Sequence, residues 1–121
     1  MKILIAEDDT MVREMLDAFL TDQGHSVQSA ENGVELVKLA LSEKPDLIVT
    51  DMHMPEMTGN SMVAMLDMYA PLASVPVIMV TGATRSELAD AGIPTEIPIL
   101  SKPVDFDRLM AEVNKVASRL P

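Results

Sequence analysis

Residues 46–51 read DLIVTD, an apolar run that closes on an aspartate. A strand covered by helices on both faces needs an unbroken apolar run, and this stretch supplies one from Leu47 to Val49. Asp51 is therefore expected where a buried strand leaves the sheet. A carboxylate in that position can cap a helix, form a turn or take part in chemistry, and its neighbours must decide among these roles.

Apolar runs alternate with amphipathic stretches along the whole chain. Five strand-like runs read KILIA, HSVQSA, DLIVT, VPVIMVT and IPILS, and helical patterns occupy residues 11–23, 33–42, 59–68, 85–91 and 105–119. The first helical stretch carries an apolar stripe of Val12, Met15, Leu16, Phe19 and Leu20 and ends before Gly24, a C-cap. This alternation predicts an α/β fold, a (βα)5 doubly wound parallel sheet with helices on both faces.

Length and composition predict one domain over residues 1–121, since 48% hydrophobic residues suffice for a single core. No run approaches the ~20 apolar residues that span a bilayer. The start MKILIAEDD turns acidic too early for a signal peptide, so a cytoplasmic protein without membrane association is expected. The chain has no cysteine, which excludes disulfides and thiolate metal sites.

The charge balance argues against direct nucleic-acid binding. Nineteen acidic and nine basic residues give a formal net charge of −10. The lysines and arginines are scattered and form no basic stripe that could follow a phosphate backbone.

Polar residues gather at the predicted carboxyl ends of the strands, where open α/β sheets bind ligands. These residues are Glu7, Asp8 and Asp9 after the first strand, Asp51 after the third, Thr81 and Gly82 at the fourth, and Ser101, Lys102 and Pro103 at the fifth. Asp9 or Thr10 can be explained as a cap of the first helix. Glu7 and Asp8 would face Asp51 and repel it unless a cation lies among them, and Mg²⁺ prefers such oxygen ligands.

Thr81 and Lys102 complement this acidic group. Taken singly, each has an ordinary explanation, as a strand-ending threonine and an exposed lysine. Together, a hydroxyl and an ammonium facing a metal-loaded aspartate would stabilise the oxygens of a transferring phosphoryl group. The aspartate would then be the nucleophile and form an acyl phosphate.

Four motifs in this order, ILIAEDD, TDMHMP, VTGA and SKP, make the chain resemble a response regulator receiver domain of two-component signalling, chemotaxis-regulator-like, over its whole length. The resemblance implies a flavodoxin-like sheet of five parallel strands in the order 2-1-3-4-5. It implies Asp51 as the phospho-acceptor, Asp8 as a ligand of Mg²⁺ or Mn²⁺, and Glu7 acting on the metal through water. It also implies the backbone carbonyl of His53 as a further ligand.

At the other two motifs, the resemblance implies that the Thr81 hydroxyl turns toward the phosphoryl group and that Lys102 forms its salt bridge. A cis bond between Lys102 and Pro103 is also implied. A histidine kinase, a phosphotransfer protein or acetyl phosphate would be the donor, and a downstream effector protein or domain would be the second partner. The expected function is a phosphorylation-activated switch that catalyses only its own phosphorylation and dephosphorylation.

Two features depart from the family pattern. Ile99 stands where family members usually carry Tyr or Phe, three residues before the strand-five lysine. The fourth helix is predicted to be short, and Pro94 and Pro98 follow it in a long connection. We therefore expect the segment from Gly82 to Ser101 to respond to phosphorylation without an aromatic swing.

Two alternatives remain at this stage. A small Mg²⁺-dependent phosphatase of the haloacid dehalogenase type also forms an aspartyl phosphate, but its nucleophile lies on strand one in a D-x-D pattern, where this chain has Glu7, Asp8 and Asp9. A pseudo-receiver would keep the fold as an interaction module without being phosphorylated. Turnover of an external phosphate ester favours the first, and failure of Asp51 to accept phosphate favours the second.

Overall fold

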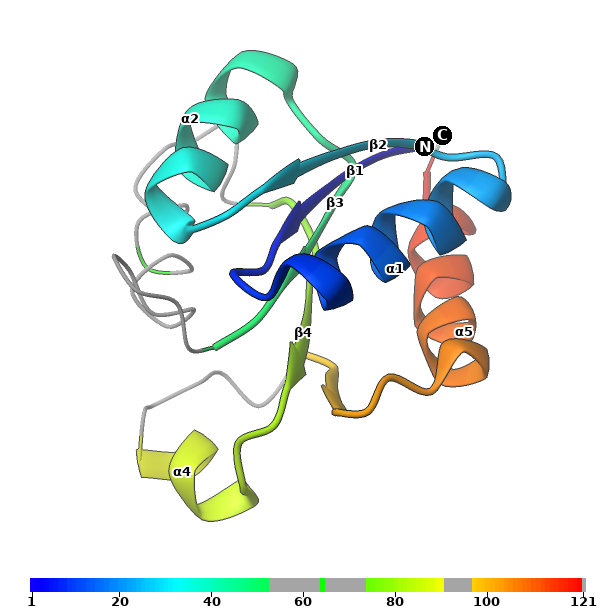
Figure 1. The fold of residues 1–121 in the computed structure, drawn as a ribbon. Coiled ribbons are helices and arrows are strands. Elements are labelled where there is room, and N and C mark those ends of the chain that lie inside the picture. The colour runs from blue at the N-terminus through cyan, green and yellow to red at the C-terminus, as the bar shows by residue number, and fades with distance from the viewer. Residues whose placement is uncertain (53–63, 65–73, 91–96, 121) are drawn as a thin grey trace.

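Five parallel strands form one sheet in the order β2-β1-β3-β4-β5, as predicted (Figure 1). The computed structural model describes residues 1–52, 64, 74–90 and 97–120. The strands are β1 (Lys2–Ala6), β2 (Ser26–Ala30), β3 (Leu47–Thr50), β4 (Val77–Thr81) and β5 (Ile99–Ser101). The helices are α1 (Thr10–Asp22), α2 (Gly33–Glu43), α4 (Arg85–Asp90) and α5 (Phe106–Ala117). The helix predicted at residues 59–68 lies outside the described residues, apart from position 64.

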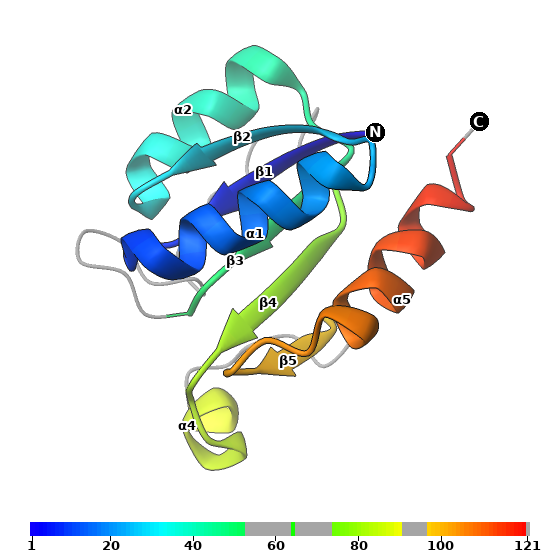
Figure 2. The same cartoon turned by 45° about the vertical axis from the view of Figure 1, so that its right-hand side comes forward.

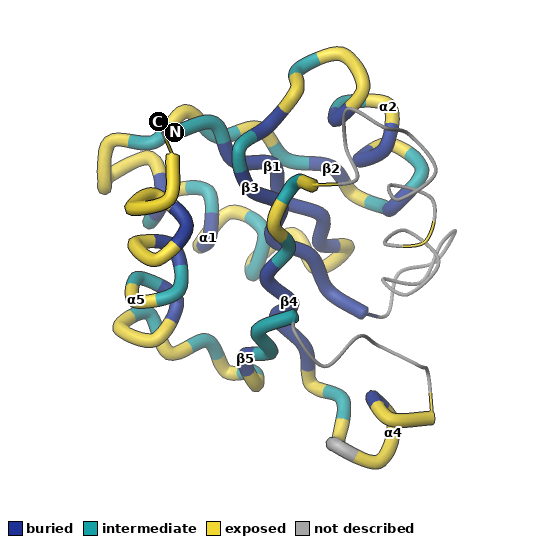
Figure 3. The backbone as a smooth tube through the Cα atoms, turned by 180° about the vertical axis from the view of Figure 1, so that it is seen from behind, coloured by how far each residue is buried: buried dark blue, intermediate teal, exposed yellow. Residues whose placement is uncertain are grey.

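Helices α1 and α5 cover one face of the sheet and α2 covers the other (Figure 2). Each strand alternates its side chains between these two faces. On β1, Ile3 and Ile5 pack with the core-facing residues of α1 and α5. Leu4 and Ala6 point the other way and pack with α2. Because successive side chains of a strand face opposite sides, a strand with two covered faces must be apolar throughout. Figure 3 shows the result: β1, β3 and β4 are buried along almost their whole length, whereas the edge strands β2 and β5 are only partly buried.

Helix α1 begins and ends one residue earlier than the predicted range 11–23. The Asp9 carboxylate accepts hydrogen bonds from the backbone N–H groups of Met11 (2.9 Å) and Val12 (3.2 Å), so Asp9, and not Thr10, is the N-cap. Gly24 follows the C-cap residue Gln23 with φ +92°, a left-handed conformation that glycine adopts without steric cost.

The prediction for one residue of the apolar stripe on α1, Met15, is wrong. Met15 is 47% exposed, whereas Leu16 and Leu20 are buried. Consecutive helical residues are about 100° apart, so Met15 lies well to one side of the direction that Leu16 and Leu20 share. The structure describes six residues of α4, Arg85–Asp90, which lie within the predicted range 85–91. No helix among the described residues is both long and apolar enough to cross a membrane.

Asp105 is the N-cap of α5, and its removal gives a stability prediction. Its carboxylate accepts hydrogen bonds from the N–H groups of Asp107 (3.0 Å) and Arg108 (3.2 Å). Asp105→Ala is expected to lower the free energy of unfolding by about 1 kcal/mol, measured by urea denaturation. Asp105→Asn keeps an acceptor oxygen and should remain close to the parent. Equal losses in the two variants would contradict capping as the cause.

Candidate functional site

The strand register brings the predicted residues after β1 and β3 together. Ala6 pairs with Thr50, so Glu7 and Asp51 leave the sheet at the same level on neighbouring strands. The Asp51 N–H donates to the Ala6 carbonyl at 3.1 Å, which extends the pairing by one residue. Both carboxylates therefore start from backbone that the sheet holds in place.

Strands β4 and β5 supply the other side of the site. Thr81 pairs with Ser101, and the Lys102 N–H donates to the Thr81 carbonyl at 2.9 Å. The Thr81 side chain is fully buried, and its hydroxyl oxygen accepts a hydrogen bond from the Ala83 N–H at 3.1 Å. The bond between Lys102 and Pro103 is cis, which confirms that expectation.

Three carboxylates converge at this edge of the sheet. One carboxylate oxygen from each of Glu7, Asp8 and Asp51 lies within 4.8 Å of the other two. Glu7 is 1% exposed and Asp51 is 7% exposed, while Asp8 is exposed. A hard cation with oxygen ligands fits this donor set. His53, whose carbonyl was expected to complete the ligands, lies outside the described residues.

Lys102 places its ammonium among the acids. The Nζ atom lies 2.5 Å from Glu7 Oε1 and 2.8 Å from Asp51 Oδ2. The ammonium thus neutralises one of the two negative charges that the buried pair of carboxylates carries. With the Asp8 carboxylate included, the group keeps two negative charges, enough to attract a divalent cation.

The pKa values of Glu7 and Lys102 reflect this arrangement. Burial raises the pKa of Glu7, and the hydrogen bond from Lys102 only partly offsets the effect. Burial alone would lower the pKa of Lys102, but the hydrogen bonds and charges of Asp51 and Glu7 outweigh it and raise the pKa. Lys102 is therefore held in its charged form.

The Asp51 carboxylate is oriented through both of its oxygens. Oδ1 accepts a hydrogen bond from the Met52 N–H at 2.6 Å, and Oδ2 accepts one from Lys102 Nζ. The Thr50 hydroxyl donates to the Asp51 carbonyl at 3.0 Å, which restrains the backbone at the same residue. An oriented carboxylate beside a cation is suited to attack an electrophile.

The residue that follows Thr81 lies at open surface. A Cβ atom built on Gly82 would meet no atom within 4 Å. Gly82 itself is exposed, so the fully buried Thr81 is followed at once by open surface.

Arg13 is a residue near the site that the sequence analysis missed. Its Nη1 donates to the Glu7 carbonyl at 2.8 Å, and its side chain is only 14% exposed. A positive charge close to the N-terminus of a helix opposes the helix dipole, which made the position of Arg13 unusual, but the sequence did not indicate which group Arg13 contacts.

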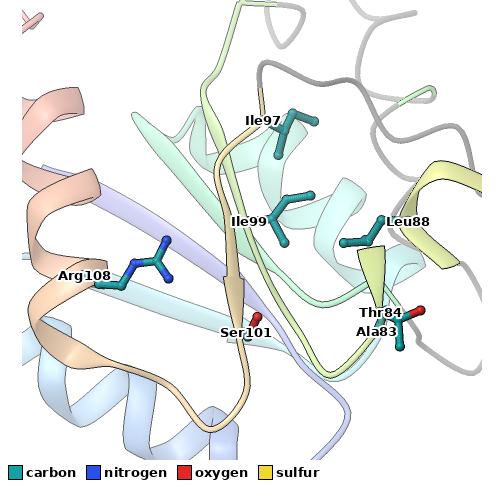
Figure 4. A pocket seen from close by; sticks show the side chains of 7 residues that line it. All are labelled: Ala83, Thr84, Leu88, Ile97, Ile99, Ser101 and Arg108. Atoms are coloured by element: carbon teal, nitrogen blue, oxygen red, sulfur yellow. The ribbon is translucent and has the colours of Figure 1, made fainter. Parts of the chain in front are cut away.

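A separate pocket of about 440 Å³ lies between α4, β5 and α5 (Figure 4). Its lining residues are Ala83, Thr84, Leu88, Ile97, Ile99, Ser101 and Arg108. In Figure 4, Ile97, Ile99 and Leu88 of α4 lie on one side of the β5 chain, with Arg108 on its other side. Ile99, the residue that replaces the usual aromatic side chain, thus lies in the wall of this pocket.

Comparison with known proteins matches residues 3–114 to the response regulator receiver domain. Protein PilH of Pseudomonas aeruginosa is 36% identical over 95% of this chain and 96% of its own length. The "Probable transcriptional regulator ycf29" of Pyropia yezoensis is 33% identical over 98% of this chain, which spans 54% of that relative. The solved structure of Vibrio cholerae chemotaxis protein CheY4 is similar with a TM-score of 0.85 and 29% identity, covering 95% of this chain and 97% of that one.

Proposed function

The chain belongs to the response regulator receiver domain family, and on that basis we propose that it is a switch activated by phosphorylation of Asp51. The observation that carries this proposal is the position of the Asp51 carboxylate, which lies between two further acids and the Lys102 ammonium. Receiver domains are signalling switches of two-component systems and generally are not enzymes. The proposal therefore limits catalysis to the chain's own phosphorylation and dephosphorylation.

In the proposed reaction, an Asp51 carboxylate oxygen attacks the phosphorus of a phosphohistidine or of acetyl phosphate. The new O–P bond forms as the P–N or P–O bond to the donor breaks, and the donor keeps the bonding electron pair. Lys102 Nζ, 2.8 Å from Asp51, stays beside the oxygens of the transferred group and neutralises part of their charge. Attack of water on the acyl phosphate then returns phosphate and the free carboxylate.

Glu7, Asp8 and Asp51 are the residues proposed to hold Mg²⁺ or Mn²⁺, with the His53 carbonyl as a further ligand. Their oxygens lie within 4.8 Å of one another and, after Lys102, retain excess negative charge. When bound, the ion offsets charge on the phosphoryl oxygens and orients them for in-line transfer. Glu7 is tied to Lys102 and would act through water, which leaves the exposed Asp8 as a direct ligand.

Removal of Asp8 should weaken metal binding. Asp8→Ala is expected to lower the affinity for Mg²⁺ by about 1–3 kcal/mol, on the scale of hydrogen bonds to charged groups. Calorimetric titration with Mg²⁺ measures the difference. Asp22→Ala removes another exposed acid, at the far end of α1, and serves as the matched control. Equal affinities in Asp8→Ala and the parent would count against the metal site.

Two observations favour the switch over the other candidates. The candidate nucleophile follows β3, whereas a haloacid dehalogenase phosphatase carries it on the first strand. The arrangement of Asp51, Lys102 and the acids is also complete enough for phosphorylation, which a pseudo-receiver does not need. Incubation with acetyl phosphate and Mg²⁺, followed by intact-mass measurement over time, tests the function. A transient gain of one phosphoryl group that EDTA prevents is expected, and an unchanged mass would favour the pseudo-receiver.

The proposed partners are a histidine kinase or phosphotransfer protein and a downstream effector, in the cytoplasm, with residues 1–121 acting as one receiver domain. Relatives include transcriptional regulators of greater length, so the effector can be another domain or another protein. Phosphorylation adds about −1.5 to −2 charges at Asp51. Thr81 and Lys102 are proposed to rearrange toward that charge and pass the change to the segment that lies between them, Gly82 to Ser101.

Phosphorylation is expected to change hydrogen exchange in this segment. The six-residue α4 contributes one buried apolar residue, Leu88, to its small cluster, so local opening there is cheap. Ile99 has no aromatic ring or hydroxyl that could move between a buried and an exposed position. The pocket beside Ile99 instead leaves space in which Leu88 and Ile99 can repack. Protection in α4 and β5 should differ between the free and beryllofluoride-bound forms. Changes confined to α1, with α4 and β5 unaltered, would contradict this output and leave the phospho-acceptor assignment intact.

A further inference from the structure

The loop after β1 is restrained mainly at Glu7. The Glu7 N–H donates to the Ala30 carbonyl at 3.2 Å, and its carboxylate contacts Lys102 and accepts from the Asp9 N–H at 3.2 Å. Asp8, the next residue, differs from both of its neighbours. Among the residues that the structure describes, none forms a hydrogen bond or ion pair with the Asp8 side chain. The direction of that carboxylate therefore depends on the backbone that carries it.

Arg13 holds the peptide that sets this direction. Its Nη1 donates to the Glu7 carbonyl at 2.8 Å, and the Glu7 carbonyl belongs to the planar peptide that joins Glu7 to Asp8. Fixing the carbonyl oxygen therefore also fixes the N–H of Asp8 and limits where its Cβ can point.

The fork of the guanidinium joins this peptide to two further segments. Nη2 lies 3.4 Å from the hydroxyl oxygen of Thr10 at the start of α1, and 3.9 Å from Glu31 Oε1 in the loop after β2. The contact with Glu31 is weak because that side chain is 72% exposed. The side chain of Arg13 is only 14% exposed, so its orientation is set by the surrounding structure.

From these contacts we infer that Arg13 is a positioning residue of the metal site. By holding the Glu7 carbonyl, Arg13 orients the next residue, Asp8, so that its carboxylate points toward Asp51. The inference rests on the proposed function, since it concerns how the acids hold Mg²⁺. Arg13 neither binds the metal nor contacts Asp51 in this role. Groups that orient metal ligands in this way affect metal affinity without touching the ion.

The sign of the effect separates positioning from charge. A guanidinium near the site repels a divalent cation, so loss of its charge alone would strengthen Mg²⁺ binding. Loss of positioning would weaken it. If the Mg²⁺ affinity falls when the positive charge of Arg13 is removed, the cause is therefore lost orientation of the Asp8 carboxylate. If the Arg13 contact supported only the fold, the Mg²⁺ affinity of the folded variant would not change.

The test is a Mg²⁺ titration of folded protein, followed by the NMR signals of the backbone amides. Arg13→Met should raise the half-saturating Mg²⁺ concentration about tenfold, at the low end for groups that orient metal ligands. Arg13→Lys keeps the charge but lacks the fork and should show a smaller increase. Arg119→Met removes an equal charge from an exposed position after α5 and should match the parent.

The results of these titrations either support or overturn the role of Arg13. Affinity in Arg13→Met equal to or tighter than the parent's overturns it, and if Arg13→Met fails to fold, parent-like affinity in Arg13→Lys overturns it instead. A parent that binds no Mg²⁺ overturns the proposed function as well. Binding by the parent with unchanged binding by the variants overturns only the role of Arg13.

Discussion

Asp51→Asn is expected to abolish phosphorylation by acetyl phosphate or a cognate kinase while the protein stays folded. Asparagine keeps the shape of the side chain and an oxygen that can accept from the Met52 N–H, which lies 2.6 Å from Oδ1 in the parent. It lacks the charged oxygen that would attack phosphorus and would form the acyl phosphate. Intact mass after incubation with donor and Mg²⁺ measures the loss, and circular dichroism reports whether the fold is retained.

The matched control removes a different carboxylate from the same part of the molecule. Asp9→Asn changes an acid two residues from Glu7 but keeps an N-cap oxygen for α1, so it should still be labelled. A gain of one phosphoryl group in Asp51→Asn equal to that of the parent would show that another residue is the acceptor.

Lys102→Met is expected to lower stability markedly in the absence of divalent cations. The substitution leaves Glu7, 1% exposed, and Asp51, 7% exposed, with no ammonium between them. Breaking a fully buried ion pair costs about 3–5 kcal/mol, and partial exposure of the Lys102 side chain reduces the expected loss to about 1–3 kcal/mol. Urea denaturation in EDTA measures the free energy of unfolding.

Added Mg²⁺ should recover part of that loss. A cation that binds only the folded state stabilises it by mass action, and the variant offers it an uncompensated pair of acids. The stability difference between Lys102→Met and the parent is therefore expected to narrow as Mg²⁺ increases. Lys115→Met breaks an ion pair on the surface of α5 and should change stability by less than about 0.5 kcal/mol. Equal stability of Lys102→Met and the parent in EDTA would contradict the role of the ammonium.

The fold follows from local patterns that the sequence displays directly. Continuous apolar runs predict β1, β3 and β4, because strands covered on both faces have no room for polar side chains. The ends of α1 follow from capping chemistry, with the Asp9 carboxylate before the helix and Gly24 after it. The prediction that Met15 belongs to the buried stripe of α1 was wrong. Met15 lies at the edge of that stripe, and the sequence does not show which edge the sheet covers.

The candidate site was only partly accessible to the same reasoning. Residues at strand ends converge because the sheet is parallel, so the grouping of Glu7, Asp8 and Asp51 was predictable. The double contact of Lys102 with two carboxylates depends on the length and rotamer of a flexible side chain, which no spacing rule specifies. The contact of Arg13 with the Glu7 carbonyl likewise joins a side chain to backbone across a loop, so it emerged only from the structure.

Chemical location of the phosphoryl group distinguishes Asp51 from every other possible acceptor. The protein is incubated with acetyl phosphate and Mg²⁺, treated with borohydride, digested and analysed by tandem mass spectrometry. Borohydride reduces an aspartyl phosphate to the alcohol, which leaves homoserine in place of the aspartate. We expect homoserine at position 51 and at no other aspartate. Homoserine at another position, or an unmodified Asp51 in protein that has gained the phosphoryl mass, would contradict this expectation.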